Sequence, residues 1–191
     1  MTDDEVFQIF RETKALLNGH FELRSKLHSN CYFQCAEVLR WPHHAQTLCT
    51  ELVRRMKEET DIGTVTGVIS PALGGILVGH EVAKALGTQC IFAEKNAEGK
   101  LLMRRFKINP GERYVVAEDV ITRGGRVQET IDIVEAAGAE VAAVLVLVDR
   151  SGGAAKFAYP TFALLHITPE VWTAETCPMC KANEPFCHPG S

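Results

Sequence analysis

The densest group of chemically useful side chains lies in the stretch YVVAEDVITRGGRV. Glu118 and Asp119 stand side by side after an apolar run, and Thr122, Gly124 and Gly125 follow ahead of a helical pattern. Glycines let backbone N–H groups approach a phosphate, and a helix N-terminus favours its negative charge. Carboxylates accept hydrogen bonds from vicinal hydroxyls or hold Mg²⁺ through water. The stretch predicts a sugar-phosphate site, with a capped helix start and a glycine turn as the alternative.

Two further loops lie at the ends of apolar runs. SPALGGI follows one run, and VDRSGG ends the run VAAVLVLV. In an open parallel sheet, ligands bind beyond the carboxyl ends of the strands, where such loops gather. Arg150, in the second loop, has a guanidinium fork that can pair with a carboxylate through two hydrogen bonds. Taken separately, the first loop is equally a packing turn, and Arg150 is equally a surface residue.

A cationic segment connects Phe92 to Ile108. It carries five basic side chains, which are Lys95, Lys100, Arg104, Arg105 and Lys107. Clustered cations stabilise negative charge that builds on a departing anion. The alternative is the solvated face of a hairpin.

The tail contains a Cys-x-x-Cys pair and a Cys-His pair, formed by Cys177, Cys180, Cys187 and His188. These residue types can bind zinc tetrahedrally if the tail folds back on itself. A structural zinc site is therefore one reading of residues 174–191, and an irregular tail without metal is the other. The chain has seven cysteines, an odd number that does not suit a secreted disulfide framework.

The N-terminal segment predicts a helix. A capping box of Thr2 and Glu5 starts it, and a helical stripe runs through Leu16 and Leu17 to a stop at Gly19. Farther along the chain, helices and strands alternate. Helices are predicted at 42–60, 76–86 and 127–137, and strands at 64–69, 89–93, 114–117, 141–148 and 162–166. The alternation predicts one α/β domain over residues 1–191, with a mostly parallel sheet flanked by helices.

Composition narrows the function classes. The net charge is −4, which gives no overall field for attracting nucleic acid or anionic lipid. The N-terminus is acidic where a secretory signal would be basic, and no stretch approaches the ~20 apolar residues of a membrane span. We therefore expect a cytoplasmic protein that acts on small molecules.

The stretch around Glu118 resembles the fingerprint of type I phosphoribosyltransferases, in which two acids and two spacer residues precede Thr-Thr-Gly or a close variant. The resemblance implies that fold, with a small hood and a mobile loop. It assigns the ribose hydroxyls of phosphoribosyl pyrophosphate to Glu118 and Asp119. It assigns the 5-phosphate to the turn formed by Thr122, Arg123, Gly124, Gly125 and Arg126, with Val120 and Ile121 as further contacts to phosphoribosyl pyrophosphate. The two arginines depart from the family pattern, and we interpret them as altered anion contacts.

Other segments resemble the orotate phosphoribosyltransferases, in their short bacterial form. GHFELRSKLHSNCYFQ is similar to the N-terminal hood of that family, which implies orotate contacts from His28 and Phe33. Thr122 and Arg150 complete the implied base pocket. For Phe33, a place in the core is the alternative. SPALGGI resembles the diphosphate loop, in which the backbone of Ala72, Leu73 and Gly74 binds the leaving group.

The resemblance makes residues 19–35 and 94–108 hood elements, the second being a mobile loop that reaches a partner subunit. It therefore implies a homodimer. It assigns catalytic roles to Asp119, Lys95, Lys100 and Arg104. Mg²⁺ is the implied cofactor, held mainly by substrate with help from Glu118 and Asp119. The implied reaction joins orotate to the phosphoribosyl group in pyrimidine biosynthesis. The alternatives are a purine or uracil phosphoribosyltransferase and a regulator that senses phosphoribosyl pyrophosphate without catalysis.

Overall fold

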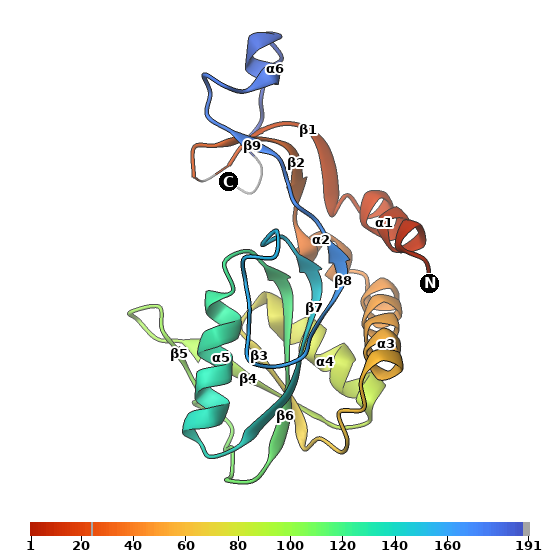
Figure 1. Cartoon of the computed structure of the whole chain (residues 1–191), viewed down its shortest axis with the longest axis vertical. Coiled ribbons are helices and arrows are strands. Elements are labelled where there is room, and N and C mark those ends of the chain that lie inside the picture. The colour runs from red at the N-terminus through yellow and green to blue at the C-terminus, as the bar shows by residue number, and fades with distance from the viewer. Residues whose placement is uncertain (24, 189–191) are drawn as a thin grey trace.

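The computed structural model describes residues 1–23 and 25–188. Its body is a six-stranded sheet with the strand order β5-β4-β3-β6-β7-β8 (Figure 1). The strands are β3 (Gly67–Pro71), β4 (Gln89–Lys95), β5 (Leu101–Leu102), β6 (Arg113–Ile121), β7 (Glu140–Asp149) and β8 (Thr161–His166). All neighbouring pairs are parallel except β4 with β5. The predicted mostly parallel sheet is confirmed.

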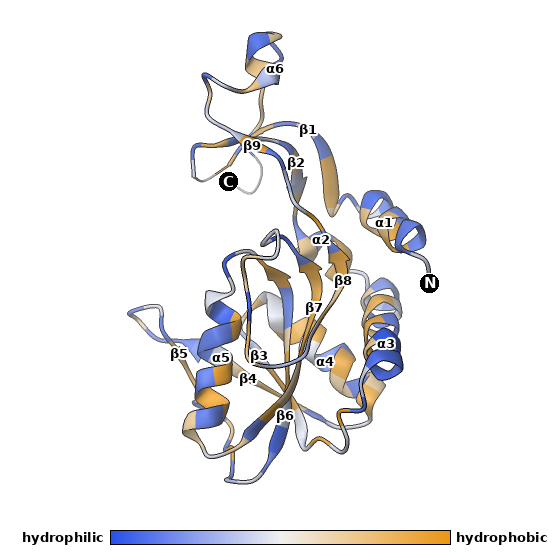
Figure 2. Ribbon diagram, viewed as in Figure 1, coloured by the Kyte–Doolittle hydropathy of each residue, from blue (hydrophilic) through white to orange (hydrophobic). Residues whose placement is uncertain are grey.

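Helices cover both faces of this sheet. They are α1 (Asp3–Glu12), α2 (Cys35–Leu39), α3 (Pro42–Glu59), α4 (Gly74–Leu86) and α5 (Gly125–Ala136). Successive residues of β6 enter opposite layers: Val115 and Ala117 pack with α3 and α4, and Tyr114 and Val116 pack with α5. This alternation follows from the two-residue repeat of a strand. The middle of each central strand is therefore apolar on both faces, whereas the helices carry polar residues on their outer sides (Figure 2).

The predicted helices after residue 42 are confirmed within about two residues at each end. Pro42 occupies the first turn of α3, where its missing N–H costs no hydrogen bond. Gly87 caps α4 with a left-handed backbone, at φ 72°. The prediction for the first helix was partly wrong. Its capping box is present, but the helix ends at Glu12, and Leu16 and Leu17 belong to a strand.

A second, smaller sheet rises from one end of the body (Figure 1). It consists of β1 (Leu16–Glu22), β2 (His28–Phe33) and β9 (Val171–Trp172), with antiparallel pairing. Above it lies α6 (Pro178–Lys181), so the tail is not wholly irregular. We call β1, β2, β9 and α6 the hood. It joins residues near the N-terminus to the end of the described chain.

Among the described residues, no helix combines the length and the apolar character that crossing a lipid bilayer requires.

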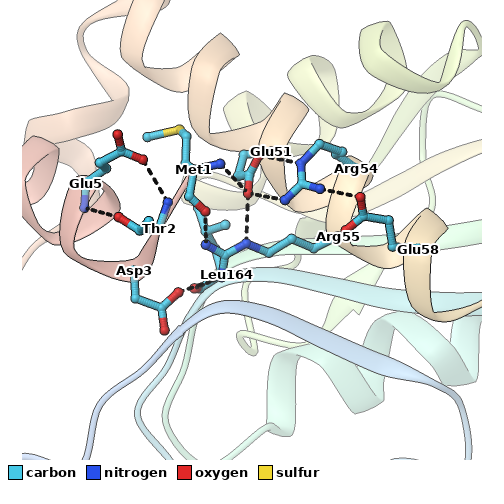
Figure 3. Close-up of polar contacts among 9 residues, drawn as sticks. All are labelled: Met1, Thr2, Asp3, Glu5, Glu51, Arg54, Arg55, Glu58 and Leu164. Atoms are coloured by element: carbon cyan, nitrogen blue, oxygen red, sulfur yellow. Dashed lines mark hydrogen bonds and ion pairs between the residues drawn. The ribbon is translucent and has the colours of Figure 1, made fainter.

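Glu51 anchors the N-terminal segment to α3 (Figure 3). Its buried carboxylate accepts hydrogen bonds from Arg54 at 2.8 Å and from Arg55 at 2.9 Å, and it pairs with the amino group of Met1 at 3.0 Å. Arg55 also pairs with Asp3 of α1 at 2.8 Å. The hydrogen bonds from Arg54, then those from Arg55 and Met1, hold the pKa of Glu51 well below its ordinary value.

We expect Glu51→Gln to lower the free energy of unfolding at pH 7 by about 1–2 kcal/mol, because it leaves the partly buried cations of Arg55 and Met1 without a charged acceptor. The folded-state pKa of Glu51 is lowered, so its contribution is complete above the ordinary pKa of 4.5 and is lost as the pH falls below it. Urea unfolding at pH 7 and pH 3 measures the effect, and the difference between variant and wild type should shrink at pH 3.

Glu37→Gln is the matched control, since Glu37 pairs with Arg40 on the surface. It should change stability by less than about 0.5 kcal/mol. Equal losses for the two variants would contradict the role given to Glu51.

Candidate functional site

The acidic pair lies at the carboxyl end of β6. Sequence reasoning placed Glu118 and Asp119 after the strand, but β6 continues to Ile121 and includes both. Glu118 is buried, and its Oε1 accepts a hydrogen bond from the Asp119 N–H at 3.0 Å. Asp119 Oδ1 accepts one from the Val120 N–H at 2.9 Å. The carboxylates are therefore held on rigid strand backbone.

The start of α4 is packed directly against these acids. A Cβ added at Gly74 would lie 2.6 Å from Asp119 Oδ2, and one at Gly75 would lie 2.9 Å from Glu118 Oε1. No side chain fits at either position without moving a carboxylate. The Ala72 N–H, one residue past the end of β3, donates to the Ala93 carbonyl at 2.8 Å, which ties this loop to β4. Backbone groups of the loop thus lie beside the acidic pair.

The turn after β6 lines a cavity of about 250 Å³. Its walls are Glu118, Val120, Ile121, Thr122, Arg123, Gly124, Gly125, Arg126, Val127 and Glu129. Gly124 has φ 79°, and a Cβ there would lie 2.9 Å from the Phe157 ring. α5 begins at the next residue, so its first N–H groups, which have no partner within the helix, open beside the cavity. This arrangement can bind an anion.

The cationic segment forms a hairpin that projects from the body (Figure 1). It is attached to α5: Arg126 donates to the Gly99 carbonyl at 2.8 Å, and the Leu101 N–H donates to Glu129 at 3.1 Å. Arg126 also pairs with Glu129 at 2.9 Å. Its guanidinium therefore holds the hairpin while it lines the cavity. Lys100 and Arg104 are exposed on the hairpin.

Burial raises the pKa of Glu118 well above its ordinary value, and the charge of Asp119 raises it further. Lys95, at the end of β4, partly opposes that rise. Behind the pair, the thiol of Cys35 donates to the Asp119 carbonyl at 3.5 Å. Burial, followed by the charge of Asp119, raises the pKa of this thiol well above its usual range. Cys35 is thus an inert support that sequence reasoning missed.

Arg150 lies at the end of β7, one strand away. The backbone N–H of Arg150 donates to the Ile121 carbonyl at 2.8 Å, which joins the loop after β7 to the end of β6. Its side-chain Nε is buried and has no hydrogen-bond partner among the described residues. A buried donor of this kind calls for an acceptor. The position suits a ligand carboxylate beside Thr122.

Two residues expected in the base pocket lie elsewhere. Phe33 is buried in the core, where its ring contacts that of Phe10 with centroids 5.0 Å apart. The core alternative therefore holds for Phe33. His28 is buried in the hood and is within hydrogen-bond distance of His20 and Cys180. Neither ring is free to stack on a ligand, because each is already enclosed by protein.

The predicted zinc ligands also need correction. Four metal-binding side chains do converge, but they are His20, His28, Cys177 and Cys180. Cys187 is exposed and pairs through its backbone with β1, and His188 lies near Glu22 at 3.6 Å. The hood sheet brings two histidines to the Cys-x-x-Cys pair in place of Cys187 and His188. The signal in the sequence was weak, because the two halves of the group are more than 140 residues apart.

Comparison with solved structures defines the fold first. The chain is similar to an orotate phosphoribosyltransferase of Mycobacterium tuberculosis in complex with inorganic phosphate, with TM-score 0.68, 21% identity, and coverage of 86% of this chain and 95% of the other. It is also similar to an adenine phosphoribosyltransferase of Rhodothermus marinus, with TM-score 0.63, 19% identity, and coverage of 84% and 99%. The fold is that of type I phosphoribosyltransferases.

Sequence relatives then identify the family, although no family model matches the chain. The chain is 47% identical to the orotate phosphoribosyltransferase of Heliobacterium modesticaldum, across all of this chain and 99% of the relative. It is 46% identical to that of Chlorobaculum parvum, across all of this chain and 97% of the relative. The chain belongs to the orotate phosphoribosyltransferase family, as its motifs predicted.

The contact between Gly74 and Asp119 gives a prediction about ligand binding. We expect Gly74→Ala to weaken the binding of phosphoribosyl pyrophosphate with magnesium by about tenfold or more, because the new methyl displaces the carboxylate by an ångström or so. Calorimetric titration measures this affinity.

Gly87→Ala is the control. Its Cβ meets no atom within 4 Å, but the backbone φ is 72°. It should cost about 1 kcal/mol of stability and leave binding unchanged. Unchanged binding in Gly74→Ala together with weakened binding in Gly87→Ala would refute the role given to the contact between Gly74 and Asp119.

Glu118 gives a prediction about stability. Because its folded-state pKa is raised, ionising it costs stability as the pH rises above the ordinary 4.5, and no cost exists below that value. We therefore expect Glu118→Gln to stabilise the ligand-free protein at pH 8 by about 1 kcal/mol or more, with little effect at pH 4. Thermal unfolding at the two pH values measures it. A destabilised variant at pH 8 would contradict this account.

Proposed function

We propose that the chain transfers the phosphoribosyl group of 5-phospho-α-D-ribose 1-diphosphate to orotate, giving orotidine 5′-monophosphate and diphosphate. The step belongs to pyrimidine biosynthesis in the cytoplasm. One observation carries the proposal: the carboxyl ends of β3, β6 and β7 bring together the start of α4, the acidic pair with its anion turn, and an arginine whose Nε has no hydrogen-bond partner among the described residues. We assign these in turn to the leaving diphosphate, the sugar phosphate and the base.

The turn after β6 holds the sugar phosphate. Backbone N–H groups between Thr122 and Arg126, with the N-terminus of α5, bind the 5-phosphate. Asp119 and Glu118 accept hydrogen bonds from the ribose hydroxyls. Val120 and Ile121 shape the wall of the cavity, and Arg123 adds a cation at its rim. Because the acids sit on a strand, the sugar is held in one orientation.

The diphosphate leaves beside the start of α4, where Gly74 is packed against Asp119. The backbone of Leu73 and Gly74 is our candidate for its contacts, whereas the Ala72 N–H is already donated to the Ala93 carbonyl. As the bond at C1 breaks, positive charge develops on the sugar and negative charge on the departing diphosphate. Lys95 of the same chain stabilises the departing group. Lys100 and Arg104 are exposed on the projecting hairpin. We propose that they act on the site of a second subunit, an arrangement that requires a homodimer.

Orotate occupies the space beside Arg150 and Thr122. The guanidinium of Arg150 pairs with the orotate carboxylate, which turns N1 of the ring toward C1 of the sugar. Attack comes from the side opposite the diphosphate. Alignment of the reactants supplies much of the rate, so no strong general base is required.

The acidic pair also fits a magnesium ion. Its oxygen donors suit a hard cation, and a cation would offset the repulsion that raises the pKa of Glu118. When bound, magnesium neutralises charge on the diphosphate and the sugar oxygens. We propose that substrate supplies most of its ligands, with Asp119 and Glu118 as protein partners.

Loss of orotate on adding phosphoribosyl pyrophosphate and magnesium tests this function. We expect wild-type turnover with orotate and at least about 100-fold lower kcat/KM with uracil, hypoxanthine or xanthine, because only orotate offers Arg150 a carboxylate. Arg150→Ala should lower kcat/KM for orotate by about 100-fold and leave binding of the sugar diphosphate intact. Asp119→Asn should lower both kcat/KM for orotate and the affinity for the sugar diphosphate by about tenfold or more.

Two charge-removing variants outside the site serve as controls. Asp132→Asn on α5 and Arg11→Ala on α1 change exposed side chains, and both should keep wild-type kinetics. Preference for a purine or for uracil would show a different base specificity. Ligand binding without any turnover would support a sensing role in place of catalysis.

A further inference from the structure

We propose that His20, His28, Cys177 and Cys180 bind a structural zinc ion that fastens the tail to the hood sheet. The four ligand atoms all lie within 4.8 Å of one another. His20 comes from β1 and His28 from β2; Cys177 is the N-cap of α6, and Cys180 lies within that helix. The reaction proposed above uses none of these four side chains, so this site is independent of it.

The distances suit tetrahedral coordination. Cys177 Sγ lies 3.5 Å and Cys180 Sγ 3.6 Å from His20 Nε2, and Cys180 Sγ lies 3.3 Å from His28 Nδ1. In a tetrahedral site with zinc bonds of about 2.0 Å to nitrogen and 2.3 Å to sulfur, these atoms are about 3.5 Å apart. The two ring nitrogens lie 2.6 Å apart, so an ion would separate them by less than about 1 Å.

Hydrogen bonding alone does not explain the group. His20 Nε2 lies within 3.6 Å of three other ligand atoms, which are on His28, Cys177 and Cys180. A ring nitrogen carries at most one proton, which can point at only one of them. A single cation satisfies all three neighbours at once, because each of them can direct a lone pair to the same point.

The outer nitrogen of His20 is hydrogen-bonded as in metal sites, and that of His28 faces a carboxylate beyond hydrogen-bond distance. His20 Nδ1 is 2.9 Å from the Glu184 carbonyl, and His28 Nε2 is 3.9 Å from a Glu22 carboxylate oxygen. In metalloproteins a ligating histidine donates its other ring N–H to a carbonyl or carboxylate, which fixes the tautomer and the ring plane. The Glu184 carbonyl therefore leaves His20 Nε2 as an inward lone pair, and the negative charge of Glu22 favours a proton on His28 Nε2, which leaves Nδ1 facing the group.

The site is closed, which favours a structural role. His20, His28 and Cys177 are buried, and Cys180 is partly buried. Four protein ligands leave no open position for substrate. Two thiolates and two imidazoles in a tetrahedron favour zinc over hard cations such as magnesium. The ion would link His20 and Cys177, which are 157 residues apart in the chain. Apart from such an ion, short backbone pairing at Cys187 connects the tail to β1.

Metal analysis of the purified protein, dialysed against metal-free buffer, tests the proposal. We expect about one zinc per chain in wild type and less than about 0.2 in Cys180→Ser. Cys187→Ser is the matched control, because Cys187 is in the same tail and outside the group, and it should keep the metal. Replacement by cobalt should give the intense visible bands of a tetrahedral ion with thiolate ligands.

A second measurement on wild type covers the case that Cys180→Ser fails to fold. Removing the metal with a chelator should speed proteolytic cleavage after residue 173 by about tenfold or more, and zinc, but not magnesium, should reverse this. Wild type that stays free of zinc after incubation with it would overturn the proposal. So would another metal in its place, or equal metal loss in Cys187→Ser and Cys180→Ser.

Discussion

The close contact between the start of α4 and the acidic pair of β6 constrains the rest of the site. β3 and β6 are parallel neighbours, paired from Gly67 with Tyr114 to Ile69 with Val116. Their carboxyl ends therefore open at the same edge of the sheet. Glycines at 74 and 75 let the helix start reach the carboxylates, and the left-handed Gly124 turns the chain into α5. Backbone N–H groups and carboxylates thereby converge without any long side chain.

Placing the two carboxylates side by side destabilises the ligand-free protein electrostatically. Glu118 is buried next to Asp119, and few opposing charges are near it. Such a pair weakens the free protein but binds a cation or sugar hydroxyls strongly, because one backbone hydrogen bond to each carboxylate uses only part of its accepting capacity. Arg150 is the cationic counterpart, with a buried donor that lacks an acceptor. Both features favour a site that becomes fully satisfied only when substrate fills it. The Glu51 network contributes stability elsewhere, by joining the N-terminus and α1 to α3.

The sequence predicted the body of the fold well, because local signals agree there with packing. Pro42, Gly87 and the apolar run of β7 each specify one local structure. The prediction failed where contacts between distant segments decide. Leu16 and Leu17 continue a helical stripe, but Lys14 adopts φ 59° and the chain turns into β1. The places of His28 and Phe33, and the convergence of His20 on the tail cysteines, depend on the hood, which no local pattern specifies.

The central claim is that the turn between β6 and α5 wraps a sugar phosphate while the acidic pair holds its hydroxyls. A crystal structure with ribose 5-phosphate tests it most directly. We expect phosphate oxygens within about 3 Å of backbone nitrogens between Thr122 and Arg126, and ribose hydroxyls at the same distance from Asp119. A phosphate bound elsewhere, with this turn empty at saturating ligand, would contradict the account.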